Sequence, residues 1–178
     1  MTQIVSDYAL FDARISNSSA AVVVGEQGLI YQLTYDGTLW KVNAVKSPTL
    51  QELDAVSLTA DGLGWVVGQG GTVLRTTDSG RTWQSQNWAD STVNFSSVST
   101  ADGRSGWVVG HNPNGEVTVI YTCDGGNTWI SESAGSQNVL AVAAVDAHTA
   151  WIGGQYGTIL KTMTSGLVPT PGASLACL

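Results

Sequence analysis

Charged side chains are scarce in this chain. They account for 12% of the 178 residues, about half of the roughly 25% that is usual in globular proteins. Basic residues are the scarcer kind, with seven lysines and arginines against fourteen acids and a net charge of −7. Nucleic-acid phosphates are bound by cationic surfaces, so this balance argues against a nucleic-acid partner. No apolar run approaches the ~20 residues of a membrane-spanning helix, so no membrane insertion is predicted.

Cysteine and histidine are also sparse, with two of each. Cys123 and Cys177 allow one bridge at most, and their spacing does not indicate a disulfide framework. His111 and His148 lack the spacing of metal ligands, so the sequence predicts no metal site and no cofactor. The N-terminus has no basic start followed by an apolar run, which predicts cytoplasmic synthesis without a signal peptide, or release inside a larger particle such as a phage virion.

Glycine and tryptophan, in contrast, are abundant, with 21 and 7 copies, and indicate a turn-rich β protein. An apolar tetrad ending in glycine recurs along the chain. Its copies are VVVG at 22–25, WVVG at 65–68, WVVG at 107–110 and WIGG at 151–154. Other positions keep the same register, and only the third repeat carries an insertion, in the segment HNPNGE at 111–116. A constant period of ~40–45 residues is typical of propeller repeats.

Each repeat is predicted to form four short strands. The first alternates apolar and polar residues, as in LDAVSL at 53–58, and the second is the apolar tetrad, as expected of a strand covered on both faces. A third strand, such as GTVLRT at 71–76, follows a turn, and the fourth begins at a tryptophan, as in TWQSQ at 82–86. This pattern predicts an all-β fold, a small propeller with four blades of four antiparallel strands. One domain is predicted over residues 1–166, with repeats at about 10–42, 53–86, 95–132 and 139–166 and a C-terminal tail at 167–178.

The most specific motif lies between the third and fourth strands. TTDSGRTW at 76–83 and TCDGGNTW at 122–129 fit the pattern S/T-x-D-x-G-x-T-W of the Asp-box, or bacterial neuraminidase repeat. We expect its aspartate to accept hydrogen bonds from turn amides, its glycine to adopt positive φ and its tryptophan to pack on the blade. The predicted structural residues are Asp78, Gly80, Trp83, Asp124, Gly126 and Trp129. Tyr35 and Thr164 occupy the aspartate position in the first and fourth repeats.

The segment GWVVGQGGTVLRTTDSGRTW at 64–83 resembles a repeat of the photosystem II stability/assembly factor-like family of Asp-box propellers. The resemblance extends, as a repeat pattern, over about residues 10–166. It implies a non-enzymatic propeller that binds other proteins. Family members have seven blades and are exported, whereas this chain has four repeats, so the expectation covers the fold and the binding role and not the photosynthetic one.

A propeller covers its edge strands, usually by joining its first and last blades. The fourth repeat stops before its fourth strand, and residues 2–6 lie in register to supply that strand. This predicts a closed four-bladed ring in which residues 2–6 pair with the strand at 157–162. The alternative is a half-ring that pairs with a second copy of the chain.

No enzymatic site is predicted. The repeat resembles that of sialidases, whose active site combines three arginines with a tyrosine nucleophile, a glutamate and an aspartate acid/base. The chain has only four arginines, of which Arg75 falls in a strand and Arg81 at a variable Asp-box position. No Ser-His-Asp spacing and no Gly-rich phosphate loop stand out, so no catalytic residue is assigned.

The turns between second and third strands are expected on one end of the blades, together with the connections between blades. This turn face is polar, with Glu26, Gln27 and Gln69 among its residues, and suits protein or glycan contacts. The predicted partner-binding residues are Trp88, His111, Asn112, Asn114, Gln155 and Tyr156. Local packing is the alternative interpretation of Trp88, and solvated loop surface that of the others. The predicted function is a protein-interaction or assembly module, with a virion component as one setting and a glycan-binding module as the alternative.

Overall fold

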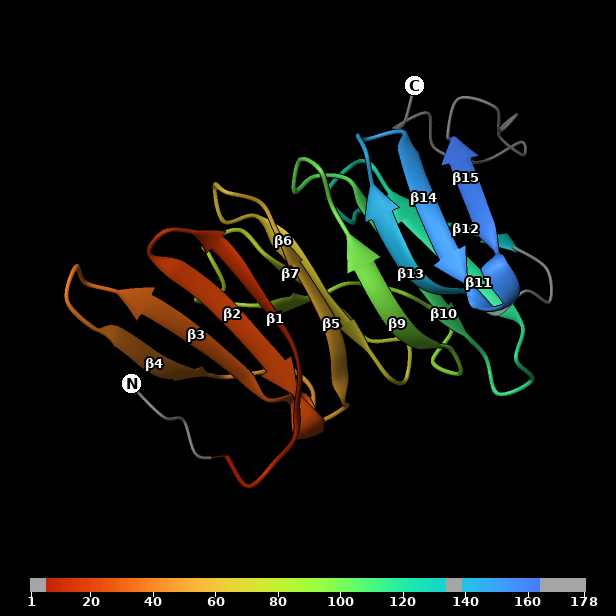
Figure 1. Ribbon diagram of the computed structural model, residues 1–178. Helices are drawn as coiled ribbons and strands as arrows, with labels where there is room; N and C mark the ends of the chain where they lie inside the picture. Colours follow the sequence, from red (N-terminus) through yellow and green to blue (C-terminus); the bar gives the residue numbers. More distant parts are fainter. Residues whose placement is uncertain (1–5, 134–138, 164–178) are drawn as a thin grey trace.

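The computed structural model of the protein describes residues 6–133 and 139–163. Regular structure in these residues is β, apart from two short 3-10 turns, η1 (Glu26–Gly28) and η2 (Gln155–Gly157). The strands form four antiparallel sheets that follow one another in chain order, here called blades 1 to 4 (Figure 1). The predicted all-β class and the blade-by-blade organisation are thereby confirmed.

The strands of each blade lie side by side in sequence order. Blade 1 consists of β1 (Leu10–Asn17), β2 (Ala20–Gly25), β3 (Ile30–Tyr35) and β4 (Trp40–Val45). Blade 2 consists of β5 (Leu53–Leu58), β6 (Gly64–Gly68), β7 (Val73–Thr76) and β8 (Gln84–Ser85). Blade 3 consists of β9 (Asn94–Ser99), β10 (Gly106–His111), β11 (Val117–Thr122) and β12 (Ile130–Ser133). Blade 4 consists of β13 (Val139–Ala144), β14 (Thr149–Gly154) and β15 (Ile159–Met163).

Alternate residues of each second strand face different neighbours. In β6, Trp65 and Val67 join the apolar layer shared with blade 3, whereas Val66 joins the layer shared with blade 1. The same alternation in β10 places Trp107 toward blade 4 and Val108 toward blade 2. The tetrad is apolar at successive positions because these strands have no solvent face. Burying each such side chain stabilises the fold by about 1.5–3 kcal/mol.

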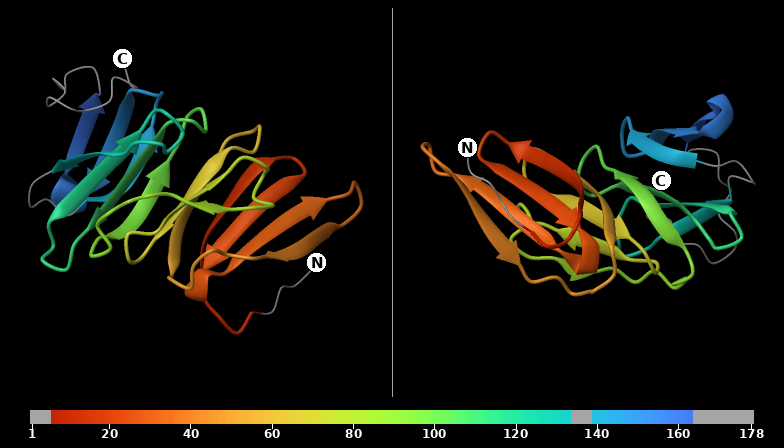
Figure 2. Two further views of the ribbon diagram at one scale, coloured as in Figure 1. Left: turned by 180° about the vertical axis from the view of Figure 1, so that it is seen from behind. Right: turned by 60° about the horizontal axis from the view of Figure 1, so that its bottom comes forward.

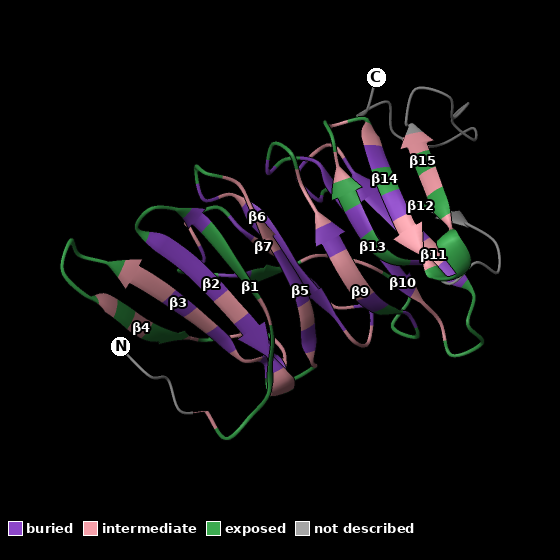
Figure 3. Cartoon of the chain, in the orientation of Figure 1, coloured by how far each residue is buried: buried purple, intermediate pink, exposed green. Residues whose placement is uncertain are grey.

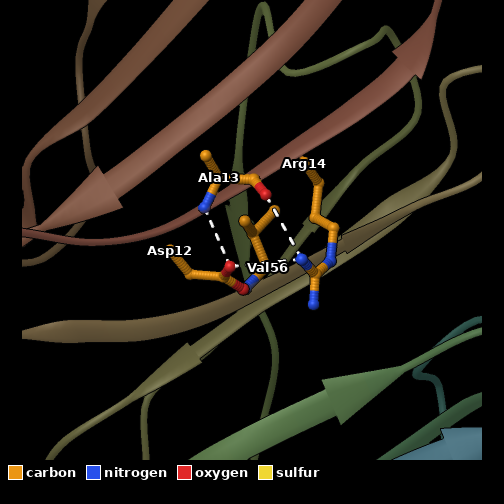
Figure 4. A network of polar contacts seen from close by, with 4 residues as sticks. All are labelled: Asp12, Ala13, Arg14 and Val56. Carbon is orange, nitrogen blue, oxygen red and sulfur yellow. Dashed lines mark hydrogen bonds and ion pairs between the residues drawn. The ribbon is translucent and has the colours of Figure 1, made fainter.

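The first strands of the blades contact one another in succession, β1 with β5, β5 with β9 and β9 with β13, and are called the inner strands. Asp12 of β1 joins two of them (Figure 4). Its Oδ2 accepts the amide of Val56 at 3.0 Å, its Oδ1 accepts the amide of Ala13 at 2.8 Å, and the guanidinium of Arg14 lies 3.4 Å from Oδ1. A charged side chain thereby fixes the spacing of blades 1 and 2.

Serine hydroxyls provide equivalent links farther along the arc. Their oxygens accept amides in or directly after the next inner strand in three pairs: Ser57 with Thr100 at 3.2 Å, Ser97 with Val142 at 3.2 Å and Ser99 with Ala144 at 2.9 Å. In every blade, the pairing of the inner strand with the second strand also has a register shift at the equivalent repeat position. The residues left over in the inner strands are Phe11, Asp54, Ser96 and Leu140. Such β-bulges redirect a side chain out of the sheet alternation.

Blade 4 departs from the prediction. In the part of the chain that the structure describes it has three strands, and β15 pairs with β14 alone. Residues 2–5 of the predicted closing strand lie outside the described residues. Ala9, which follows them, is bound to blade 1: its amide donates to Glu26 Oε2 and its carbonyl accepts the Glu26 amide, both at 3.0 Å.

The predicted closed ring of four blades is therefore corrected to an open arc. Blades 1 and 4 stand at its opposite ends in both views of Figure 2 and in Figure 1. Neighbouring blades pack face to face through apolar layers, and among the described residues no such layer joins blade 4 to blade 1.

Cys123 is disulfide-bonded, whereas its spacing gave no indication of a bridge. Cys177 and the C-terminal tail at 167–178 lie outside the described residues. Across residues 6–133 and 139–163, no helix has the length and apolar character to cross a membrane.

Candidate functional site

The turns between second and third strands gather on one side of the arc, at the same end of every blade, as predicted (Figure 1). We call this end the turn face. It carries η1 in blade 1, the turn after Gly68 in blade 2, the loop at 111–116 in blade 3 and η2 in blade 4. The connection at 46–52 between blades 1 and 2 lies on the same face.

A pocket of about 470 Å³ opens on the turn face where blades 1 and 2 meet. Three of its residues come from the turns and three from the connection between the blades, with one more from the segment before β1. The lining residues are Tyr8, Glu26, Gln27, Leu50, Gln51, Glu52 and Gln69. Tyr8 and Leu50 provide exposed apolar surface beside these polar groups. The pocket therefore combines apolar walls with carboxylates and amides, as ligand sites do.

Backbone contacts hold the pocket walls in place. The amide of Gln69 donates to the carbonyl of Glu52 at 3.0 Å, and Gln69 Nε2 also donates to Glu52 Oε2. On the blade 1 side, Gly28 lies directly against Thr49, where an added Cβ would be 2.1 Å from the Thr49 carbonyl oxygen. Only glycine fits at this contact, which brings η1 and the connection together.

The pocket is acidic. Glu26 and Glu52 both line it, and no basic side chain is among its lining residues. Burial raises the pKa of the bulge residue Asp54, and the negative charge of Glu52 raises it further. The charge of Glu52 therefore disfavours the ionised form of Asp54, and an incoming cation would relieve this repulsion.

The sequence analysis identified the turn face and, within it, Glu26, Gln27 and Gln69. It did not single out Tyr8, Leu50, Gln51 or Glu52, because these residues lie outside the strands that repeat. One signal was available: Leu50 is an apolar residue in a polar connection, and the structure leaves it exposed.

The loop at 111–116 in blade 3 is held by one side chain. Asn112 Oδ1 accepts the amides of Asn114 and Glu116, both at 3.0 Å, and Asn112 Nδ2 donates to Glu116 Oε2 at 2.7 Å. Asn112 thus has an internal role in the loop, while Asn114 is exposed and His111 is half-buried.

Trp88 lies beneath the turn face rather than on it. It is half-buried and packs against the apolar layer between blades 2 and 3, with its ring 6.1 Å from the ring of Phe95 in an edge-on arrangement. An added Cβ at Gly71 would be 3.1 Å from Trp88 Cδ1. These contacts favour the packing interpretation of Trp88. They also separate it from the exposed residues Gln155 and Tyr156 on blade 4.

Equivalent turn residues of three blades share an unusual backbone conformation. Gln27, Gly70 and Tyr156 each lie two positions after the tetrad glycine, with φ of 56°, 63° and 56°. A left-handed conformation costs a non-glycine residue about 1–2 kcal/mol. The Tyr156 side chain is 98% exposed, so packing contributes little to offset this cost.

Replacing Tyr156 by glycine is expected to raise the free energy of unfolding by up to about 1 kcal/mol, because relief of backbone strain exceeds the entropy cost of glycine. Urea denaturation would measure the change. The matched control is Gly70→Ala at the equivalent position of blade 2, which is expected to lower stability by a similar amount. A loss of stability in Tyr156→Gly would show that the tyrosine ring makes a stabilising contact.

The Asp-boxes lie at the opposite end of the blades, where their aspartates bind the turn. Asp124 Oδ1 accepts the amide of Thr128 at 3.0 Å and the hydroxyl of Thr122 at 2.9 Å, and Oδ2 accepts the Thr128 hydroxyl at 2.7 Å. The amide of Gly126 donates to Thr122 Oγ1 at 3.0 Å. Asp78 and Gly80 make the same set of bonds with Thr76 and Thr82.

The tryptophans of these motifs pack as apolar side chains. Trp83 is buried in the layer between blades 1 and 2, and Trp129 meets Trp65 edge-on with a centroid distance of 5.3 Å. Partial burial raises the pKa of Asp124, but the hydrogen bonds from Thr128 and Thr122 outweigh it and hold that pKa below its usual value. The acceptor role leaves these carboxylates little capacity to act on a ligand.

Blade 1 keeps this arrangement with a shift of one residue. Asp36, and not the Tyr35 position identified from the motif, accepts the amides of Thr38 and Leu39, both at 3.0 Å. The Leu39 amide, the Lys41 ammonium group at 2.9 Å and the Thr38 amide lower the pKa of Asp36 to about 2. Among the described residues, no group of three His, Cys, Asp or Glu side chains is placed to hold a metal ion.

The comparisons with known proteins agree with this architecture. The family model described as photosynthesis system II assembly factor YCF48 matches residues 1–91. A solved structure described as YCF48 bound to D1 peptide is 29% identical over 70% of this chain and 41% of that chain, with a TM-score of 0.58. YCF48 from Cyanidioschyzon merolae is 21% identical over 96% of this chain and 56% of that chain, with a TM-score of 0.64.

Another structural match is a computationally designed protein, Ika4, which is 16% identical over 92% of this chain and 99% of that chain, with a TM-score of 0.66. No curated protein matches the sequence. The present chain spans about half the length of the two YCF48 chains. Because the family model covers just over half of its residues, the chain belongs to the family of the photosynthesis system II assembly factor YCF48.

Proposed function

We propose that this chain is a non-enzymatic binding module that takes an extended peptide segment of a partner protein in the pocket between blades 1 and 2. The observation that carries the proposal is the pocket itself, which is built from both blades and from their connection on the turn face. Support comes from the relative described as YCF48 bound to D1 peptide, which is 29% identical to this chain.

The charge of the pocket indicates which peptide it prefers. Glu26 and Glu52 line it, and the pKa of the nearby Asp54 is raised by burial and by Glu52. A lysine or arginine side chain of the partner would bind between carboxylates while an apolar neighbour packs on Leu50. We therefore expect the preferred segment to carry a basic residue next to an apolar one.

An array of immobilised random peptides, probed with the purified chain, tests this preference. Bound peptides should be enriched in lysine and arginine, and binding should weaken as salt is raised, since exposed charges are screened. Glu52→Gln is expected to weaken binding of the selected peptide about three- to tenfold, as measured by fluorescence anisotropy.

Glu116→Gln is the matched control for Glu52→Gln. Both glutamates lie on the turn face, and each accepts a side-chain amide, from Gln69 or from Asn112, but only Glu52 lines the pocket. Unchanged binding in Glu116→Gln supports the pocket. If Glu116→Gln weakens binding and Glu52→Gln does not, the loop at 111–116 is the working surface and the proposed site is wrong.

The sequence-based alternatives have no support from a specific observation. A glycan ligand was predicted from Trp88 together with the polar turn face, and Trp88 packs against Phe95. The virion setting and the cytoplasmic location stay predictions from the sequence alone. Propellers carry both binding and catalytic functions, so the non-enzymatic role rests on the pocket chemistry and on the family and not on the fold.

A further inference from the structure

The three interfaces between blades follow one rule. The first and third residues of the second-strand tetrad face the next blade, and the second residue faces the preceding blade. Trp65 and Trp107 follow this rule, with 0% and 1% of their surfaces exposed. Each blade thus has a forward face, which is turned toward the next blade, and a backward face, which is turned toward the preceding one. At all three interfaces the forward face of one blade is covered by the backward face of the next.

The forward face of blade 4 follows the same rule, but no neighbouring blade covers it within residues 6–133 and 139–163. Trp151 occupies the position of Trp65 and Trp107, yet it is 46% exposed. Ile159 occupies the position of the buried Val73 and is 73% exposed. Figure 3 shows exposed segments on β15.

The forward face of blade 4 also shares a cation–π contact with the buried forward face of blade 2. The guanidinium of Arg75 lies over the Trp65 ring at 5.4 Å, and Lys161, seven positions after the tetrad glycine as Arg75 is, lies over the Trp151 ring at 5.7 Å. Blade 4 therefore has the forward face of an internal blade.

The backward face of blade 1 is the other blade face that the described part of the chain leaves without a neighbouring blade. Two rows of cross-strand partners run over it and are apolar throughout: Ala13, Val23, Tyr31 and Ala44 in one, and Ile15, Ala21, Leu33 and Val42 in the other. Val23 occupies the position at which Val66, Val108 and Ile152 are buried in the other blades. Ile15 is 71% exposed.

We propose that a second copy of this chain covers both surfaces. The forward face of blade 4 in each copy packs on the backward face of blade 1 in the other, so that two arcs form one ring with two-fold symmetry. Such head-to-tail contacts close when the rotation of each arc fits the ring. The arc corresponds to 56% of the Cyanidioschyzon merolae YCF48 chain, so two copies supply about the length of a whole propeller.

The polar groups at the proposed junction are consistent with this contact. At the inner strands of blades 1 and 2, the Val56 amide needs Asp12 of the preceding blade as its acceptor. The equivalent amide of blade 1, Ala13, is already bound to Asp12 of its own chain at 2.8 Å (Figure 4). Blade 4 has Ala141 where such an acceptor would lie. The junction therefore buries apolar surface without leaving this amide unpaired.

Sedimentation velocity over a range of concentrations tests the proposal with the 178-residue chain. The expected species has twice the mass of the chain. Ile159→Asp on blade 4 and Ile15→Asp on blade 1 should each raise the dissociation constant at least about thirtyfold, because each places a charge in an apolar contact. Tyr156→Asp on the turn of blade 4 is the control and should leave the dimer intact.

Mixing the two variants distinguishes head-to-tail contacts from a symmetric contact between like blades. A mixed dimer has one junction free of substitutions and should associate more tightly than either variant alone. Both substituted side chains are mostly exposed, so circular dichroism should show unchanged folding. A wild-type chain that stays monomeric, a dimer that survives Ile15→Asp, or masses that grow beyond two copies would each overturn the proposal.

Discussion

Trp107→Ala is expected to lower the free energy of unfolding by about 3–5 kcal/mol, as is usual for removing a large aromatic side chain from a core. The Trp107 ring is 1% exposed and lies in the layer between blades 3 and 4. It stacks on Tyr121 with a centroid distance of 4.8 Å and an interplanar angle of 22°. Its loss would leave a cavity between two sheets that cannot approach each other without disturbing the inner strands. Urea denaturation would measure the change.

Trp151→Ala provides a control at the same repeat position. The Trp151 ring is 46% exposed, so its removal deletes contacts without enclosing a cavity, and a loss below about 1 kcal/mol is expected. Both substitutions should be compared in the Ile15→Asp background, so that a second copy of the chain does not cover Trp151. Equal losses at Trp107 and Trp151 would contradict the view that the neighbouring blade, and not the repeat position, makes the tryptophan a core residue.

The strands were predictable from sequence because burial imposes a strict pattern on them. Val66 must be apolar for blade 1, and Trp65 and Val67 for blade 3, so the tetrad identifies a strand with sheets on both sides. The same reasoning could have been applied to Trp151. Its identity as tryptophan already indicates a face that another blade covers, a cover that either a closed ring or a second copy of the chain would provide.

Ring closure was not predictable from the repeat. The pattern identifies which residues face a neighbouring blade but carries no information on the angle between blades, which depends on how the side chains of the two facing sheets pack. Repeat counting therefore led to a closed ring where the structure has an open arc.

The candidate site was predictable only in part. The turn face follows from strand direction, so Glu26 and Gln69 could be placed on it from the sequence. The pocket also needs Leu50 and Glu52, which come from a connection without a repeat partner. Asp36 could not be predicted from the motif either. The motif aligns Tyr35 with the aspartate position, but the next residue, Asp36, accepts the turn amides.

Asp124→Ala is expected to lower the free energy of unfolding by about 1–3 kcal/mol, because the Thr128 amide and the two threonine hydroxyls lose their acceptor in a half-buried turn. Asp90→Ala is the matched control. Asp90 also accepts an amide and a hydroxyl, both from Thr92, but it lies in an exposed connection, so water can replace it and a smaller loss is expected.

The Asp124 carboxylate should also make the free energy of unfolding depend on pH. Partial burial raises the pKa of Asp124, but its hydrogen bonds outweigh this and hold the folded-state pKa below the ordinary value of 3.8. A carboxylate of this kind contributes its full stabilisation above the unfolded-state pKa and loses it as the pH falls through the folded-state value. The wild-type chain should therefore lose stability as the pH is lowered below about 4, and Asp124→Ala should lose less over the same range. If urea denaturation shows that Asp124→Ala loses as much stability as the wild-type chain between about pH 4 and about pH 2, other carboxylates, such as Asp78, determine the acid sensitivity.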